Sequence, residues 1–183
     1  ELAEAGDLRV ASFNVLNFFT TVVGGDANPT GSNRGALTVA EFELQRTKIV
    51  SAITRLNADV VGLMEIENNG YGDNSAIANL VAALNAAQPD EADHYRWIAS
   101  PDGKPIGTDA ITVGLIYRPA KVTPEGVAGL IALPVQQAEA VDASGKPVTI
   151  NQGMRESLVQ RFSSPKGDAP LTLVVNHLKS KGS

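Results

Sequence analysis

Residues 58–66 read Ala-Asp-Val-Val-Gly-Leu-Met-Glu-Ile, a nearly continuous apolar run in which only Asp59 and Glu65 are charged. A run of this length and composition is typical of a strand that is buried on both faces of a sheet. Strands of this kind occur mainly in α/β proteins, where helices cover the sheet. The run therefore predicts a central strand, and the segments around it indicate the type of sheet.

A helix is predicted on each side of this strand. Thr38 and Glu41 have the spacing of a capping box, and the residues after them predict a helix over 39–56. The second helix is predicted over 75–87, and Pro89 ends it. Both helices carry one apolar face, formed by Phe42, Ile49, Val50, Ile53 and Leu56 in the first and by Ile77, Leu80, Val81 and Leu84 in the second. We expect both apolar faces to pack against a sheet, which would remove them from water.

The remaining pattern is mostly strands. Residues 9–16 alternate in polarity and predict a strand, so the helix over 39–56 is expected to cross between two parallel strands. Residues 17–37, between the first strand and this helix, are rich in Gly, Asn, Thr and Pro and predict a long loop. Residues 138–147 predict an exposed hairpin or loop. Further strands are expected at 94–99, 110–117, 121–127, 156–162 and 171–177. The fold class is α/β with a mixed sheet.

Composition excludes several classes of protein. The chain has 183 residues, enough for one domain or part of a larger one, and its 43% hydrophobic residues indicate a globular protein. The net charge of -5 excludes a surface that is basic all over, so a phosphate partner would need a local basic groove or a metal ion. The sequence has no cysteine, which excludes disulfides and thiolate chemistry. No apolar run is long enough to span a bilayer.

Three polar residues follow or end apolar strands, where α/β sheets bind their ligands: Asn14, Glu65 and His177. The oxygens of Asn14 and Glu65 are hard ligands of the kind that Mg²⁺ takes together with water and substrate phosphate. The alternative is that Glu65 ends a strand in solvent and Asn14 makes a turn. The residues alone leave both interpretations open.

His177 and one further residue, Arg155, could carry chemistry of another kind. His177 suits general acid or base work near neutral pH, and the alternative is a partly buried histidine that bonds to backbone, which is our interpretation of His94. Arg155 stands before a predicted strand, where its guanidinium fork could hold phosphate oxygens. A surface ion pair with Glu156 is the alternative for Arg155.

Five segments together resemble the endonuclease/exonuclease/phosphatase superfamily, which includes deoxyribonuclease I, and within it the bacterial extracellular nucleases. They are RVASFNVLNF, EFELQRTKIVSAITRLNADVVGLMEIEN, GTDAITVGLIYRPAKV, GMRESLVQRF and VVNHLKSKGS. The resemblance implies a four-layer α/β sandwich over residues 8–183, preceded by an N-terminal extension at 1–7. It also implies a secreted protein that acts on DNA or RNA, with Mg²⁺, Mn²⁺ or Ca²⁺ as cofactor and no membrane partner.

The resemblance also assigns roles to residues. Asn14 and Glu65 match the metal-binding amide and carboxylate, and His177 matches the histidine near the scissile phosphate. Asp109 matches the carboxylate that accompanies this histidine, while Arg155 and Asn176 are expected to bind the substrate phosphate. The implied reaction is the in-line attack of water on a phosphodiester.

The sequence departs from the superfamily in one respect. The Gly-Asp-Phe-Asn strand end and the final Asp-His pair of the superfamily do not occur in it. We therefore expect the N-terminal half of the sandwich, with the C-terminal part absent, and no nuclease activity from this half alone. A phosphomonoesterase, a sphingomyelinase-type phosphodiesterase, and a non-catalytic fragment that pairs with a partner are the alternatives.

Overall fold

The computed structural model describes residues 8–152, 155–164 and 170–178. Its elements form a four-stranded sheet, a three-stranded sheet and a separate two-stranded hairpin. The elements, in chain order, are β1 (Val10–Phe18), η1 (Thr21–Val23), α1 (Val39–Leu56), β2 (Val60–Glu67), α2 (Ala76–Ala86), η2 (Glu91–Asp93), β3 (Arg96–Trp97), β4 (Ile111–Tyr117), β5 (Thr123–Ile131), β6 (Gln136–Val141), β7 (Pro147–Gln152), β8 (Ser157–Ser163) and β9 (Leu171–Val175). The expected N-terminal extension at 1–7 lies outside the described residues.

The four-stranded sheet has the order β1-β2-β4-β3, with β1 and β2 parallel and the other pairs antiparallel. Helix α1 crosses between the parallel strands, as the sequence predicted. Its first turn has the full capping box, in which the Thr38 side chain accepts from the Glu41 N–H and the Glu41 side chain accepts from the Thr38 N–H. Asn57 ends α1 in the left-handed conformation.

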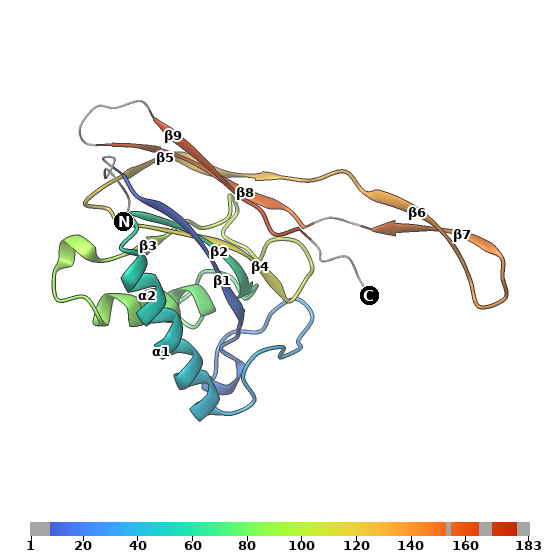
Figure 1. Ribbon diagram of the computed structural model, residues 1–183, viewed down its shortest axis with the longest axis horizontal. Helices are drawn as coiled ribbons and strands as arrows, with labels where there is room; N and C mark the ends of the chain where they lie inside the picture. The colour runs from blue at the N-terminus through green and yellow to red at the C-terminus, as the bar shows by residue number, and fades with distance from the viewer. Residues whose placement is uncertain (1–7, 153–154, 165–169, 179–183) are drawn as a thin grey trace.

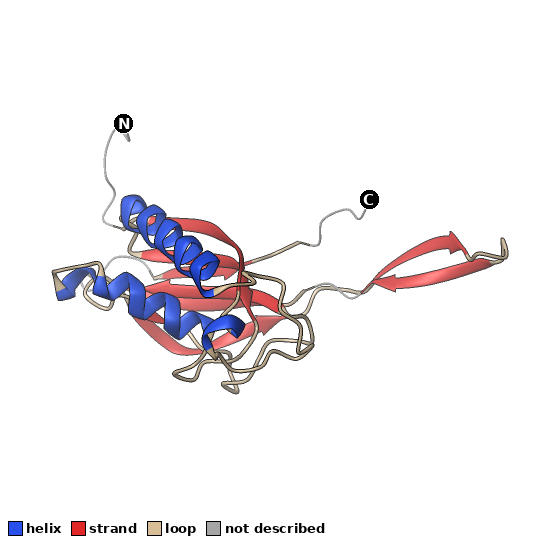
Figure 2. Cartoon of the chain, turned by 90° about the horizontal axis from the view of Figure 1, so that it is seen from below, coloured by secondary structure: helices blue, strands red, loops and turns tan. Residues whose placement is uncertain are grey.

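The second sheet has the order β5-β8-β9 and packs on the face of the first sheet that the helices leave open (Figure 1). Helices α1 and α2 lie side by side on the other face (Figure 2). This gives three layers: helices, sheet, sheet. The mixed α/β class is thus confirmed, while a fourth layer of helices is not seen among the described residues.

Two apolar cores hold the three layers together. The core under the helices contains the buried Phe42 and Ile53 of α1 and the buried Val61 and Leu63 of β2. The core between the sheets includes Tyr117 of β4 and Phe162 of β8, whose ring centroids lie 5.5 Å apart. Strand β2 contributes to both cores through alternate residues, which explains why its sequence is apolar almost throughout.

Gly62 sets how closely the two sheets approach. A Cβ atom at this position would lie 3.2 Å from the nearest methyl group of Val175 at the end of β9. The lack of a side chain therefore lets the end of β9 pack directly on β2. This close approach brings His177, two residues after β9, towards the region of β2 that contains Glu65.

The hairpin of β6 and β7 extends away from the body of the molecule (Figure 1). Its strands pair from Gln136↔Gln152 to Val141↔Pro147 and pack closely against no other described helix or strand. This confirms the exposed hairpin predicted around residues 138–147. No helix among the described residues is long and apolar enough to cross a membrane.

Candidate functional site

The parallel strands β1 and β2 are both irregular at the same level of the sheet. Their register runs regularly to Asn14↔Met64 and shifts before Phe18↔Ile66. Glu65 has a φ of 62°, and Leu16 and Asn17 on β1 have φ values of 55° and 54°. Left-handed backbone is uncommon for residues other than glycine, and bulges of this kind redirect side chains near active sites. Asn14 and Glu65 thus lie at neighbouring irregularities.

The Asn14 side chain is already used in part. Its Oδ1 accepts a hydrogen bond of 2.8 Å from the backbone N–H of Leu16. This is the turn that the sequence offered as the alternative to a metal ligand. An amide oxygen has two lone pairs, so the bond leaves one of them for a further contact.

Glu65 and His177 meet across the two sheets. His177 Nε2 lies 3.5 Å from Glu65 Oε1, with 16% and 23% of the respective side chains exposed. Burial lowers the pKa of His177, as does the charge of Arg155, and together these outweigh the opposite effect of Glu65 and Asp109. The ring is therefore more readily neutral than a free histidine. Its Nδ1 is buried and has no hydrogen-bond partner among the described residues.

Asp109 joins two arginines from distant parts of the chain. Its Oδ1 accepts from Arg34 Nη1 at 2.8 Å, and its Oδ2 accepts from Arg155 Nε at 3.1 Å. Burial raises the pKa of Asp109. The hydrogen bonds from Arg155 and from the Ala110 N–H lower this pKa, as do the charges of Arg155 and Arg34, and their combined effect is larger than that of burial. The net result is a pKa below the ordinary value, which keeps the carboxylate ionised.

Asn68 fixes the segment that carries Asp109. Its Nδ2 donates to the carbonyl oxygens of Ile106 and Asp109, at 2.7 and 2.9 Å, and its Oδ1 accepts from the Ile106 N–H at 2.8 Å. Asn68 is 1% exposed and directly follows β2. The strand that contains Glu65 therefore also positions Asp109.

The structure brings the predicted site residues into contact in two pairs. Glu65 faces His177, while Asp109 binds Arg155. Arg155 thus pairs with Asp109, and not with Glu156 as the surface alternative supposed. Asn176 belongs to neither pair, and its Oδ1 accepts a hydrogen bond from the hydroxyl of Ser157. The roles assigned to these residues by resemblance stay predictions.

The donor set fits a hard divalent cation with few protein ligands. Glu65 offers a carboxylate and Asn14 an amide oxygen, both suited to Mg²⁺, which usually keeps several waters and binds one or two carboxylates. Within the described ranges, no group of three or more His, Asp or Glu side chains could hold a metal ion. The chemistry of Glu65 and Asn14 fits such a cation, and the metal site itself stays a prediction.

Two residues of the site were missed by the sequence reasoning. Arg34 lies in the long loop between β1 and α1, which the sequence predicted as a loop without singling out any of its residues. Glu67 lies just beyond the predicted strand at 58–66 and was given no role, yet it is 3% exposed and accepts hydrogen bonds from Thr20, Asn28 and Asn69. A second carboxylate two residues after Glu65 was the available signal.

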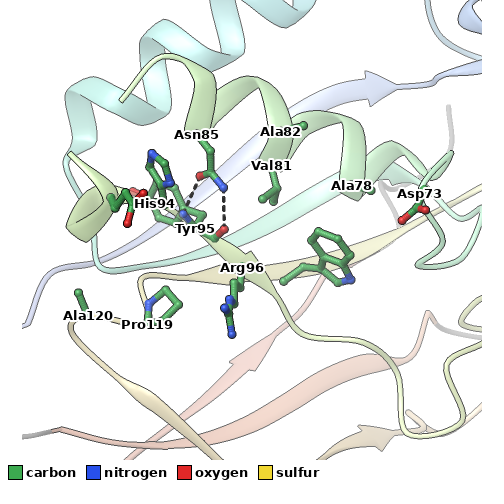
Figure 3. Close-up of a pocket in the computed structure, with 12 residues that line it drawn as sticks. Asp73, Ala78, Val81, Ala82, Asn85, His94, Tyr95, Arg96, Pro119 and Ala120 are labelled. Carbon is green, nitrogen blue, oxygen red and sulfur yellow. Dashed lines mark hydrogen bonds between the residues drawn. The ribbon is translucent and has the colours of Figure 1, made fainter. Parts of the chain in front are cut away.

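A cavity lies elsewhere, between α2 and the edge strand β3 (Figure 3). It has a volume of about 770 Å³ and is lined by Val81, Asn85, His94, Trp97 and other residues. His94 Nε2 lies 3.0 Å from the carbonyl oxygen of Gln88, which confirms that this histidine bonds to backbone. None of Asn14, Glu65, Asp109, Arg155 and His177 lines this cavity.

Comparison with known proteins identifies a similar fold. No family model matches the sequence, and no curated protein sequence matches it. Among solved structures, an endonuclease/exonuclease/phosphatase from Beutenbergia cavernae DSM 12333 superposes with a TM-score of 0.52 and 19% sequence identity. The match covers 96% of this chain and 39% of that protein. At this identity the likeness concerns the fold, and it agrees with the superfamily that the sequence motifs resemble.

Proposed function

We propose that this chain contributes one part of the active site of a metal-dependent phosphodiesterase that hydrolyses nucleic acid. The observation that carries the proposal is that two contacts, Glu65 with His177 and Asp109 with Arg155, lie where the start of β8 pairs with the end of β9. Carboxylate and imidazole groups can transfer protons in the attack of water on a phosphodiester, and a guanidinium group can stabilise the charge that develops on the phosphoryl oxygens. The similarity of fold to an endonuclease/exonuclease/phosphatase adds support.

Each residue has a distinct part in this proposal. Glu65 and Asn14 would hold Mg²⁺, with Mn²⁺ or Ca²⁺ as substitutes, and the cation would supply positive charge against the developing phosphoryl charge. His177 would hold its proton on Nε2, facing Glu65, and stay neutral near neutral pH because burial lowers its pKa. Arg155 would bind a phosphoryl oxygen through a nitrogen that Asp109 leaves free.

We further propose that residues 8–183 are the N-terminal part of a longer domain. The chain spans 39% of the length of the similar structure, and the Gly-Asp-Phe-Asn and Asp-His motifs are not in its sequence. By the resemblance, these motifs would supply the general base and part of the metal site, and the loss of a general base costs typically ~10²- to 10⁴-fold in rate. Residues 1–183 alone should therefore show no measurable turnover. Secretion and an action on extracellular DNA or RNA belong to the same proposal and follow from the resemblance.

The test compares residues 1–183 with a longer natural form that contains both motifs. Each is incubated with supercoiled plasmid, with p-nitrophenyl phosphate and with sphingomyelin, in Mg²⁺ and then in EDTA. Plasmid cleavage by the longer form only, lost in EDTA and in Glu65→Ala, supports the proposal. Cleavage of the monoester or of sphingomyelin alone would favour the corresponding alternative, and turnover that survives Glu65→Ala would overturn the site.

A further inference from the structure

The ion-pair cluster of Arg34, Asp109 and Arg155 lies beside the contact between Glu65 and His177. Leu158 of β8 pairs with Val175 of β9, and Ser157 bonds to Asn176, so Arg155 and His177 lie at neighbouring strand ends. The effect of the Arg155 and Asp109 charges on the pKa of His177 agrees with this placement. Asp109 contributes one negative charge and the two guanidinium groups contribute two positive charges. The cluster therefore keeps a net positive charge on a chain whose overall charge is -5.

Both arginines keep unused donors. Arg34 contacts Asp109 through Nη1 only, and Arg155 contacts it through Nε only. A guanidinium group carries five N–H donors, and the other nitrogens of these two groups have no partner within the part of the chain that the structure describes. The Arg34 side chain is 43% exposed and that of Arg155 is 18% exposed. A ligand can therefore reach the free donors of at least Arg34.

The position of Arg34 is fixed by a buried network at the other end of its loop. Glu67 Oε2 accepts from the Thr20 N–H at 2.8 Å, from Thr20 Oγ1 at 3.1 Å and from Asn69 Nδ2 at 3.1 Å. Its Oε1 accepts from Asn28 Nδ2 at 2.8 Å. A buried carboxylate with this many donors orders the segment that contains them, because each unmade bond would be costly.

The residues next to Arg34 are equally constrained. Asn33 Nδ2 donates to the Ala36 carbonyl at 2.8 Å, and Asn33 Oδ1 accepts from the Gly35 N–H at 2.9 Å. A Cβ atom on Gly35 would lie 2.6 Å from the Asn17 carbonyl oxygen, so only glycine lets the loop fold back onto the end of β1. The backbone on both sides of Arg34 is thus held in place before any ligand binds.

We infer that Arg34 is a second phosphate-binding residue, which Asp109 and the Glu67-anchored loop hold beside Arg155 so that the two guanidinium groups bind the backbone of a DNA strand. The inference rests on the proposed function for its substrate class. Asp109 is then a positioning residue for both arginines. An exposed ion pair by itself contributes little to stability, so an arrangement of two arginines on one carboxylate is better explained by ligand binding.

The test measures DNA binding by residues 1–183 in EDTA, so that no hydrolysis interferes. The probe is a fluorescein-labelled duplex of about 12 base pairs, titrated at about 50 to 200 mM NaCl. Arg34→Ala should weaken binding about tenfold, as expected for the loss of one charged hydrogen bond, and should reduce the salt slope by about 0.9. Arg34→Lys should keep the slope and lose part of the affinity, because it retains the charge without the fork.

Two further variants act as controls. Arg161→Ala removes an arginine of the same kind, with its Nε 2.6 Å from Glu125 Oε2 and 56% of its side chain exposed, and should leave both affinity and slope unchanged. Glu67→Gln touches no ligand but should weaken binding through Arg34, so its effect should largely disappear in the Arg34→Ala background. If Glu67→Gln does not fold, the arginine variants still decide the matter.

The inference fails if wild type shows no salt-dependent binding, or if Arg34→Ala and Arg161→Ala behave alike. These results are separable from the proposed function. Binding that depends on Arg34, together with no turnover in any longer form, would retain the phosphate site and reject the hydrolase. Turnover that depends on Glu65, together with binding that ignores Arg34, would retain the hydrolase and reject the second phosphate contact.

Discussion

At the scale of single residues, the site contains residues in the left-handed backbone conformation, which residues other than glycine rarely adopt. Glu65 adopts a φ of 62°, and the exposed Leu16 on the neighbouring strand adopts 55°. Left-handed backbone costs an L-residue roughly 1–2 kcal/mol, and it persists at functional sites when the surrounding structure imposes it. Glu65 is a candidate metal ligand and Leu16 is not. Substitutions at both positions can therefore separate the cost of the backbone conformation from the loss of a ligand.

Glycine at position 65 should stabilise the protein relative to alanine. Both substitutions remove the carboxylate, and only Glu65→Gly relieves the backbone, so its free energy of unfolding should be higher than that of Glu65→Ala by about 1 kcal/mol. Leu16→Gly against Leu16→Ala should show the same sign. In α1, Leu44→Gly against Leu44→Ala should show the opposite sign, with a loss of about 1 kcal/mol. Urea denaturation measures all three differences.

The ionisation of Asp109 predicts a pH dependence. Its pKa is lower in the folded chain than the ordinary value of ~3.9, so folding favours the carboxylate. This contribution to stability is fully present above about pH 4 and is lost as the pH falls through the lower folded pKa. The difference in unfolding free energy between wild type and Asp109→Asn should therefore be constant from about pH 5 to 7 and shrink below about pH 4. A constant difference down to pH ~3 would contradict the assigned ion pairs.

At the scale of elements, the hairpin of β6 and β7 differs from every other strand pair. One face carries Ala138, Ala140, Val148 and Ile150, as the register places Ala138 opposite Ile150 and Ala140 opposite Val148. Ile150 is 47% exposed, because the hairpin packs closely against no other described element. A two-stranded hairpin alone is only marginally stable in water.

Removing the hairpin should hardly change the stability of the body. When a short glycine-containing turn replaces residues 136–152, the free energy of unfolding should stay within about 0.5 kcal/mol of wild type. Ile150→Ala should likewise cost little, whereas Leu158→Ala on β8, which is 0% exposed, should cost about 2–5 kcal/mol. Trypsin should cut first at Lys146, in the exposed turn. A large loss on deletion would mean that the hairpin packs against the body.

At the scale of the whole molecule, the second sheet has three strands among the described residues, one fewer than the first sheet. Within the described residues β9 pairs only with β8, so its outer edge is free. A groove of about 470 Å³ lies beside this edge, lined by residues of β1, β2, β4 and β9. Val10 and Val174, which line it, are each 45% exposed. Free edges and exposed apolar surface promote association.

A charge in this groove should suppress association and dye binding. Residues 1–183 should bind an apolar dye and self-associate as concentration rises, and Val174→Lys should reduce both with little change in stability. Val127→Lys is the matched control, since Val127 is 78% exposed on β5, at the opposite edge of the same sheet, and does not line the groove. Sedimentation velocity and dye fluorescence provide the readouts. If the two variants self-associate and bind the dye to the same extent, the groove is not the surface through which the chain associates.

Local chemistry in the sequence determined the elements and most of the candidate site. Helix α1 was predicted at its observed bounds because both of its ends depend on nearby residues, Thr38 with Glu41 at the start and Asn57 at the end. Alternating polarity located β1 and a continuous apolar run located β2, although the ends of the strands moved by a few residues where turns and pairing decided them. Glu65, His177 and Arg155 were likewise named from their places beside strands, whereas Asp109 was named only from the family resemblance.

Only the tertiary structure decided how these residues meet. Arg34 and Asp109 are 75 residues apart in the sequence, and no local pattern indicates that their charges pair. The bulge at Glu65 depends on the register of β2 with both of its neighbours, which forms only when the sheet is assembled. Contacts of this kind depend on the packing of three layers, whereas helix caps and strand polarity depend on the nearest residues alone. That difference in range is why the sequence predicted the elements and the structure was needed to place Arg34 in the site.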